Sequence, residues 1–391
     1  MISLKSSLKL LQLEVIITGT LIMMPIAVPF YKSIGMDQGQ IGLSQAVFTL
    51  ALLLVNIPTG WIADRFSRKF SNAIGDLGCA IAVLLYSMAG GFAQVVLCEM
   101  LFGLSLAFSQ GADGALIKAH SEKIDKSGGL LHKINSSNAI WRPIAQIVAV
   151  IIGGFVGSYN LRLAVAISAI PFLAGVVFSL LIREEGERLV SKHKNPLRDM
   201  LRVTHETVMH SPRLRWLMLA YAVGFRVTNV TIWAFTPMLI FVGVPFQIVA
   251  LGWVLNSLSC MFGAMIAKKH AERFKRWQRF AMPITLVIVS LIVMGFGLSI
   301  YTVWLYSLLG LAWGWNTVVL KTMLQREIPD RSQATGLSIA DTASQLLYVP
   351  LVWVVALAGN FDIRLSLLAT AAIFAPMAII IALKLKKFEM K

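Results

Sequence analysis

The sequence predicts an all-α integral membrane protein with twelve transmembrane helices, arranged as two six-helix bundles with both termini in the cytoplasm. Composition gives the first indication. Hydrophobic residues make up 57% of the 391-residue chain and charged residues only 14%, whereas a soluble domain carries about 25% charged residues. Two further observations are the length of the apolar runs and the placement of the positive charges between them.

The apolar runs give the number of spans. A helix needs about 20 mostly apolar residues to cross the hydrocarbon core, and the mean hydropathy of the chain is +0.74. The predicted spans, in chain order, are 9–31, 40–63, 71–90, 92–117, 135–157, 162–182, 214–240, 246–267, 280–299, 302–322, 334–358 and 363–384.

The distribution of Lys and Arg orients these spans. With a cytoplasmic N-terminus, nearly all of the 35 basic residues fall in inner segments, and the outer loops hold only Lys32, Arg162 and Arg364. Because cytoplasmic loops accumulate Lys and Arg, both termini are predicted to lie in the cytoplasm. The net charge of +16 is therefore attributed to topology, and no nucleic-acid partner is predicted.

A long polar segment divides the chain into two halves. The predicted domains are a bundle at 1–182, a cytoplasmic linker at 183–213 and a bundle at 214–391. The middle of the linker, 197–209, mixes apolar and charged residues, so it forms either an amphipathic surface helix or a disordered connection. A Gln-Ile pair opens both the second and the eighth span, at Gln40 and Gln247. Two six-helix repeats of this kind are typical of secondary transporters.

The end of the second span carries a dense charge cluster. Residues 60–69 read GWIADRFSRK, which resembles the G-x-x-x-D-R-x-G-R-K/R signature of the major facilitator superfamily, with Ser67 in place of the usual Gly. The preceding residues 58–60, Pro-Thr-Gly, resemble those of its drug-efflux-like, proton-antiporter branch. Asn56 stands where many members of that branch have Glu.

Two further motifs of the same family are altered. In the fourth span, Glu99 replaces the usual Arg of R-x-x-x-G, and the following Gln-Gly-Ala-Asp ends at Asp113. In the fifth span, Arg142-Pro143 stands where the antiporter motif has Gly-Pro. The resemblance implies a secondary transporter that works by alternating access, with proton-coupled efflux of an amphipathic compound as the first hypothesis.

Alternative functions remain open. Arg142 and Arg226 favour proton-coupled uptake or export of an anionic metabolite or siderophore. A non-transporting receptor or a lipid flippase belongs to a different class, and proteoliposome flux would separate both from a transporter. No GxxxxGK[ST] motif is present, so ATP-driven pumping is not predicted.

The resemblance also implies a conformational latch. In the family, the Asp at the position of Asp64 contacts the opposite bundle near the eleventh span, and a carboxylate at that helix N-terminus is stabilised by the helix dipole. Arg65 and Arg68 can hold this carboxylate, and Gly60 allows close helix approach. The alternative for the basic residues is that they only follow the positive-inside rule.

Ionisable residues inside spans are the best candidates for coupling, because each costs about 2.5–3.5 kcal/mol to insert. Glu99 and Asp113 are 14 residues apart and fall within about 40° of one another on one helical face. Desolvation favours the protonated form of a carboxyl, so these residues and Glu14 are candidates for proton coupling. Asp113 with Arg142, and Asp341 near the start of the eleventh span, are candidates for intramembrane ion pairs.

Other polar and aromatic residues are candidates for substrate binding. Arg226 falls near the middle of the seventh span, where it can bind an anionic group or form a buried structural pair. The substrate-binding candidates are Arg226, Asn229, Trp233, Phe102, Trp313 and Asn316. The alternative for the aromatic residues is simple packing or lipid contact.

The sequence predicts no cofactor and no metal site. The three cysteines are scattered, and all six histidines lie in polar segments. No His, Cys or Ser constellation within the spans indicates an enzyme. The expected partners are a small-molecule substrate, H⁺ as coupling ion and membrane lipids, and the expected state is a monomer in the cytoplasmic (inner) membrane.

Overall fold

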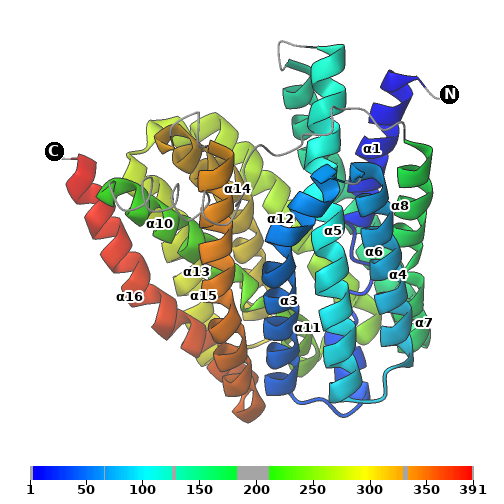
Figure 1. The fold of residues 1–391 in the computed structure, drawn as a ribbon. Helices are drawn as coiled ribbons and strands as arrows, with labels where there is room; N and C mark the ends of the chain where they lie inside the picture. The colour runs from blue at the N-terminus through cyan, green and yellow to red at the C-terminus, as the bar shows by residue number, and fades with distance from the viewer. Residues whose placement is uncertain (1–2, 66, 126–128, 183–210, 329–332, 390–391) are drawn as a thin grey trace. The chain divides into compact units, whose positions relative to one another are not determined.

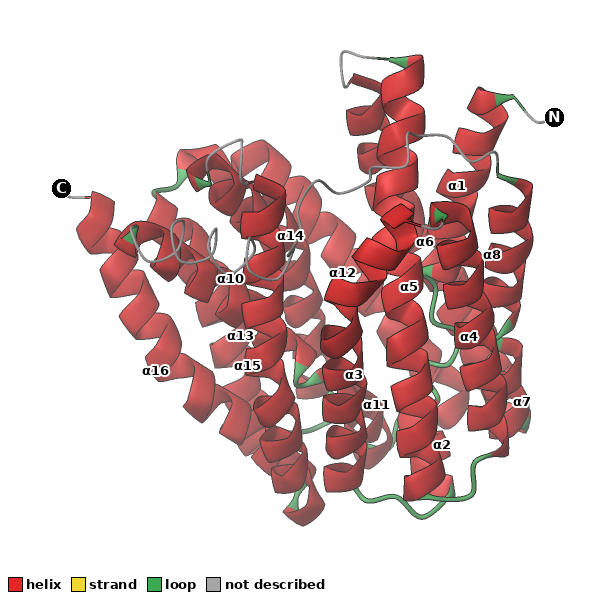
Figure 2. Cartoon of the chain, viewed as in Figure 1, coloured by secondary structure: helices red, strands yellow, loops and turns green. Residues whose placement is uncertain are grey.

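In the computed structural model, the described residues are 3–65, 67–125, 129–182, 211–328 and 333–389, and all regular structure within them is helical (Figure 2). Eleven helical segments of this part of the chain are long and apolar enough to cross a membrane. The prediction of an all-helical, multi-span protein is therefore confirmed. Most of the predicted linker, at 183–210, lies outside the described residues, together with its 197–209 segment.

The chain forms two compact units, Met1–Met36 with Val47–Lys192 and Asp37–Ala46 with His193–Lys391. In the first unit, α1, α4, α5 and α8 pack against one another, and α6 packs on α1 and α5 (Figure 1). Its helices are α1 (Leu4–Thr18), α2 (Ala27–Ser33), the greater part of α3 (Gln38–Arg65), α4 (Arg68–Met88), α5 (Phe92–Ile124), α6 (Gly129–Tyr159), α7 (Leu161–Ile167) and α8 (Ile170–Leu181).

In the second unit, α10 packs on α14, α15 and α16, α12 packs on α14, and α13 packs on α16. The start of α3 also belongs here, because the Gly39 backbone N–H donates to Asn360 Oδ1 at 3.1 Å. The helices are α10 (Pro212–Asn229), α11 (Ile232–Phe241), α12 (Val249–His270), α13 (Arg276–Gly297), α14 (Ser307–Glu327), α15 (Gln333–Phe361) and α16 (Ile363–Glu389).

Short polar side chains define where several helices begin. Ser3, Ser67, Asn160 and Ser211 each accept a hydrogen bond from the backbone N–H three residues later, and such a cap contributes about 1 kcal/mol. Ser67 is the position at which the chain departs from the family signature. The hydroxyl that replaces the usual Gly therefore acts as the N-cap of α4.

The outer surfaces of the helices are apolar. Large hydrophobic side chains such as Leu54, Met88 and Phe296 are more than 70% exposed. In water such exposure would be a liability, but in a bilayer these side chains contact lipid. The chain is a multi-pass membrane protein.

The predicted first span, 9–31, is not one continuous helix. α1 ends at Thr18, and helix resumes only at Ala27. Gly19 caps the end of α1, and Pro25 lacks the N–H that a continuing helix would need. Hydropathy reports only that the segment is apolar, so it does not detect this break.

Backbone groups in this break are satisfied by a side chain of α6. Gln146 Oε1 accepts from the Leu21 N–H at 2.9 Å, and Gln146 Nε2 donates to the Leu21 carbonyl at 3.2 Å. An added methyl group at Gly153 of α6 would collide with the Ile22 carbonyl. Gly153 therefore lets the non-helical segment between α1 and α2 approach α6 closely. Inside a membrane, opened backbone is tolerated only where protein groups satisfy it in this way.

The seventh span contains a shorter interruption, in which Val230 and Thr231 keep right-handed helical backbone angles. α10 ends at Asn229 and α11 begins at Ile232. The Thr231 hydroxyl donates to the Thr228 carbonyl at 2.9 Å, which satisfies one backbone acceptor near the break. The opening helical segment of each half is thus discontinuous, and such paired interruptions indicate binding sites in repeat transporters.

Replacing Gln146 by Leu is expected to destabilise the protein. Two partly buried backbone groups of Leu21 would lose their partner, and each unsatisfied group costs up to about 1–3 kcal/mol. The midpoint of thermal unfolding in detergent should fall clearly below that of the unmodified protein. Gln247→Leu is the matched control, because Gln247 is exposed in the structure. Equal midpoints for both variants would show that the Gln146 contact does not stabilise the break.

Candidate functional site

Three carboxyl groups from three helices meet inside the first unit. Glu14 of α1 interacts with both Asp76 of α4 and Asp113 of α5. Glu14 Oε2, Asp76 Oδ2 and Asp113 Oδ1 are buried without a hydrogen-bond donor among the described residues. Two carboxyls can bond to each other only when one is protonated. This carboxyl cluster (Glu14, Asp76 and Asp113) is therefore suited to hold a proton.

Neutral polar groups orient the carboxyl cluster. Ser109 Oγ lies 2.9 Å from Asp76 Oδ1 and 2.8 Å from Asn72 Oδ1, so its single proton can serve either oxygen. Asn72 Nδ2 in turn donates to Ser179 Oγ at 3.0 Å. The Thr18 hydroxyl lies 2.9 Å from the Glu14 backbone carbonyl oxygen and 3.4 Å from Glu14 Oε1, and it can donate to either. The partners of the acids are exchangeable hydroxyls and amides, which can adjust when a proton moves.

Small residues bring α4 and α5 close enough for these contacts. Gly75 and Gly78 of α4 face Ser109 and Ser105 of α5, and a methyl group at either glycine would overlap the facing serine. Small residues at helix interfaces let backbones approach closely in membranes. Asp76, which is 1% exposed, is therefore a full member of the site. Asp76 lies near the start of the predicted span 71–90 and is not among the predicted coupling residues.

Arg142 lies beside the first break. Its guanidinium group interacts electrostatically with Asp113, and the predicted ion pair between the two stays a prediction. It also covers Gly19, because a Cβ atom at that position would come within 2.8 Å of Arg142 Nε. Arg142 itself is exposed. Among the described residues, Arg142 interacts with Asp113 but not with Glu14 or Asp76, so full ionisation of the three acids would leave excess negative charge.

Glu99 lies in a different place from Asp113. Their separation of 14 residues corresponds to about 21 Å along the helix axis. The Tyr31 hydroxyl donates to Glu99 Oε1 at 3.3 Å, and Tyr86 also interacts with this carboxyl. The shared helical face therefore does not unite Glu99 and Asp113 in one site.

Phe102, one of the predicted substrate residues, is part of an aromatic stack in the first unit. Its ring centroid lies 5.8 Å from that of Phe48 and 5.6 Å from that of Phe172. These contacts hold α3, α5 and α8 together. The structure thus places Phe102 in packing contact between helices.

In the second unit, Arg226 faces α15 from the last turn of α10. Its Nε donates to Ser344 Oγ at 2.7 Å, and its guanidinium carbon lies 5.3 Å from the Tyr348 ring centroid. Arg226 also interacts electrostatically with Asp341, which accepts a 2.5 Å hydrogen bond from the Tyr221 hydroxyl. The three α15 partners are Asp341, Ser344 and Tyr348, and their spacings of three and four residues place them on one helical face.

Trp233 reaches the same place from beyond the second break. Its Nε1 donates to the Tyr348 hydroxyl at 3.1 Å, and its carbonyl accepts from Gln38 Nε2 at 3.0 Å. The predicted stripe of Arg226, Asn229 and Trp233 is interrupted where α10 ends at Asn229. Arg226 and Trp233 nevertheless both contact the same residue, Tyr348.

The two predicted substrate residues of α14, Trp313 and Asn316, contact α10, the helix that carries Arg226. The Trp313 ring packs edge-on against Phe225 at 4.9 Å, and Phe225 lies 4.7 Å from Tyr221. Asn316 Nδ2 donates to the Gly224 carbonyl at 2.8 Å, whereas Asn316 Oδ1 is buried without a donor among the described residues. The group thus combines the Arg226 guanidinium, several aromatic rings and the unpaired Asn316 Oδ1. Such a combination is suited to a flat, partly polar molecule.

Tyr221, Ser344 and Tyr348 were not among the predicted site residues. The spacing of Asp341, Ser344 and Tyr348 along one face was a usable signal, but only α10 shows what that face contacts. Among the described residues, no three His, Cys, Asp or Glu side chains are arranged to hold a metal ion.

Comparison with known proteins identifies the family. A family model described as Major Facilitator Superfamily matches residues 15–351. The chain belongs to the major facilitator superfamily. Its curated relatives include an uncharacterized MFS-type transporter, YitZ of Bacillus subtilis (strain 168), which is 26% identical over 155 residues covering 39% of this chain and 92% of YitZ. The quinolone resistance protein NorA of Staphylococcus aureus (strain MRSA252) is 22% identical over 54% of this chain and 53% of NorA.

Two solved transporter structures share the fold. The nucleoside transporter NupG superposes with a TM-score of 0.77 at 14% identity, covering 99% of each chain. The D-xylose-proton symporter gives a TM-score of 0.78 at 15% identity, covering 99% of this chain and 98% of that one. At this level of identity the likeness concerns the fold alone.

The signature residues of the superfamily are only partly visible. The side chains of Gly60, Asp64 and Arg65 lie outside the described residues, although all three positions are helical in α3. Arg68 is the first residue of α4. The latch proposed from the resemblance therefore stays a prediction.

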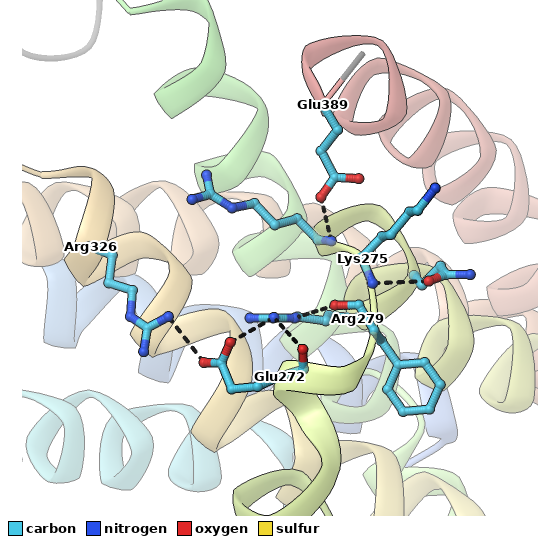
Figure 3. A network of polar contacts seen from close by, with 8 residues as sticks. Glu272, Lys275, Arg279, Arg326 and Glu389 are labelled. Atoms are coloured by element: carbon cyan, nitrogen blue, oxygen red, sulfur yellow. Dashed lines mark hydrogen bonds and ion pairs between the residues drawn. The ribbon is translucent and has the colours of Figure 1, made fainter. Parts of the chain in front are cut away.

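The second unit contains a counterpart of this signature. Residues 271–276 read Ala-Glu-Arg-Phe-Lys-Arg, where residues 63–68 read Ala-Asp-Arg-Phe-Ser-Arg. Glu272 thus corresponds to Asp64, and its carboxylate contacts Arg279 Nη2 at 2.8 Å and Arg326 Nη1 at 3.0 Å (Figure 3). Alignment of the two halves of the chain was the signal that could have identified Glu272.

A second acidic residue extends this network. Glu327 contacts Arg213 at 3.2 Å and Arg276 at 3.3 Å, and the Arg276 backbone N–H donates to Glu389 Oε1 (Figure 3). Exposed ion pairs contribute only about 0–1 kcal/mol each. The network ties α10, α13, α14 and α16 together at one end of the second unit.

Proposed function

We propose that this member of the major facilitator superfamily is a proton-coupled exporter of small amphipathic compounds that works by alternating access. The observation that carries the proposal is the meeting of three carboxyls, of which Glu14 and Asp76 are buried and Asp113 is half-buried. Clustered acids of this kind are typical of proton relays in membrane transporters. We assign proton binding to this cluster, and Glu99 is the second candidate.

The substrate is assigned to the second unit. Arg226, Tyr348 and Trp313 with their neighbours combine one cation with several aromatic rings beside the break between α10 and α11. Aromatic faces bind flat apolar groups, and the arginine can orient a polar end. The likeness to a quinolone resistance protein supports export as the direction.

We propose the remaining topology on the same basis. The broken first span counts as a membrane crossing, which gives twelve crossings with both termini in the cytoplasm. The predicted bundles 1–182 and 214–391 are joined by the linker 183–213. The protein acts as a monomer in the cytoplasmic membrane, and Gly60, Asp64, Arg65 and Arg68 form the latch.

Flux measurements on the purified protein test this function. A thermal-shift screen of amphipathic aromatic compounds first identifies a ligand, and the protein is then reconstituted into vesicles with an acidic lumen. An antiporter lets protons leave as the compound enters, so the ligand should accumulate inside and a protonophore should release it. Accumulation that is independent of the pH gradient would contradict proton coupling. Binding without any flux would indicate a receptor.

A further inference from the structure

A cavity of about 300 Å³ opens in the first unit between the first two turns of α1, the end of α5 and the start of α6. Its walls are mostly apolar. Leu8 and Ile134, which line it, are buried and belong to the hydrophobic cluster that joins these helices, and Leu130 packs against that cluster. A hydrogen bond of 2.9 Å between Gln12 Nε2 and Ser137 Oγ closes one side. The volume is at the lower end of the range for small-molecule sites.

Three lysines surround this apolar cavity. Lys5 and Lys9 are one turn apart on α1, and Lys133 reaches it from α6. All three are exposed, and none forms an ion pair within the described part of the chain. Three like charges around one cavity repel each other unless an anion lies between them.

The carboxylates closest in sequence to the cavity wall have other partners. Asp125 Oδ2 accepts a hydrogen bond of 2.9 Å from the Leu130 N–H, and Glu122 lies 3.8 Å from Lys118 on the surface of α5. Among the described residues, no carboxylate forms an ion pair with these lysines, so their positive charge can attract an external ligand. That ligand must be anionic at one end and apolar at the other.

We propose that this cavity binds an anionic phospholipid from the leaflet on the side of the N-terminus. The phosphate group lies among Lys5, Lys9 and Lys133, and the upper part of an acyl chain covers Leu8, Leu130 and Ile134. Basic pockets between transmembrane helices bind lipid head groups by this chemistry. A soluble anion uses only the lysines and gains nothing from the apolar wall. The site is separate from the carboxyl cluster and from the Arg226 group.

Lipid binding to the purified full-length protein tests this proposal. Native mass spectrometry in a neutral detergent measures binding of phosphatidylglycerol, of phosphatidylcholine with the same acyl chains, and of glycerol phosphate. Lys5→Gln, Lys9→Gln and Lys133→Gln are combined in one variant. Since each lysine contributes about 1 kcal/mol, affinity for phosphatidylglycerol should fall on the order of a hundredfold. The matched control combines Lys268→Gln, Lys269→Gln and Lys321→Gln, which are exposed lysines of the second unit, and should bind like the unmodified protein.

A second variant tests the apolar half of the cavity. Leu130→Trp fills the cavity but keeps all three lysines, so it should weaken phosphatidylglycerol binding while leaving any binding of glycerol phosphate unchanged. Equal loss in the control lysine variant would overturn the proposal in favour of diffuse surface charge. Equally tight binding of phosphatidylcholine, or of glycerol phosphate, would also overturn it, because the site would then not select an anionic lipid.

Discussion

Replacing Asp113 by Asn is expected to abolish accumulation of the ligand in vesicles with an acidic lumen, down to the level of protein-free vesicles. Asp113 interacts with Glu14, which also interacts with Asp76. An amide cannot take up and release the proton that carboxyl groups in contact share. Exchange of labelled for unlabelled ligand, which needs no net proton movement, should persist, since Asn resembles the protonated acid in shape.

Glu99→Gln is the matched control for this experiment. Glu99 is a buried carboxyl of the same helix, but it contacts Tyr31 and lies about 21 Å from Asp113 along the axis. Gradient-driven accumulation should survive this substitution. If Glu99→Gln abolishes it and Asp113→Asn does not, proton coupling belongs to Glu99.

A spectroscopic measurement separates proton binding from transport. Infrared difference spectra between acidic and alkaline pH should contain the carbonyl band of a protonated carboxyl group in the unmodified protein. Glu14→Gln should reduce or shift that band, because Glu14 contacts both other acids. An unchanged band would place the proton elsewhere in the protein, whatever the flux experiments show.

Replacing Arg226 by Ala is expected to weaken ligand binding by about tenfold to a hundredfold. The variant loses the hydrogen bond to Ser344 and the guanidinium group above Tyr348, and it leaves Asp341 without its cation. A hydrogen bond to a charged group contributes about 1.5–3 kcal/mol, which corresponds to this range. Titration of the purified protein with the ligand from the stability screen measures the dissociation constant.

Two companion variants interpret this result. Arg226→Lys keeps the positive charge but loses the planar group, so binding near the unmodified value would show that charge opposite Asp341 is sufficient. Arg364→Ala removes another arginine of the same unit, whose guanidinium carbon lies 5.3 Å from the Phe241 ring centroid, and should leave binding unchanged. Unaltered affinity of Arg226→Ala would exclude Arg226 from the binding site.

The spans could be predicted because a bilayer demands long apolar helices. The third predicted span, 71–90, corresponds to α4 at Arg68–Met88, and the ninth, 280–299, corresponds to α13 at Arg276–Gly297. The break after Thr18 could not be predicted in this way. It depends on Gln146, a residue of another helix that satisfies the backbone of Leu21.

The candidate site was predicted only in part, for a related reason. Spacing along α5 predicts that Glu99 and Asp113 lie on one face, but spacing within one helix does not reveal what each carboxyl meets. Asp113 meets Glu14 and Asp76 because the glycines of α4 let α5 approach. The interaction of Asp341 with Arg226 could likewise not be predicted, because the two residues are more than a hundred positions apart in sequence.

The paired breaks have a consequence for the history of the chain. A duplication of one ancestral half would have produced two copies of the same interrupted helix, and later substitution would have given each copy its own chemistry. The copy near Thr18 now lies among acids, whereas the copy near Asn229 follows an arginine. The two interruptions therefore lie in opposite electrostatic surroundings, one beside carboxyl groups and the other beside a guanidinium group.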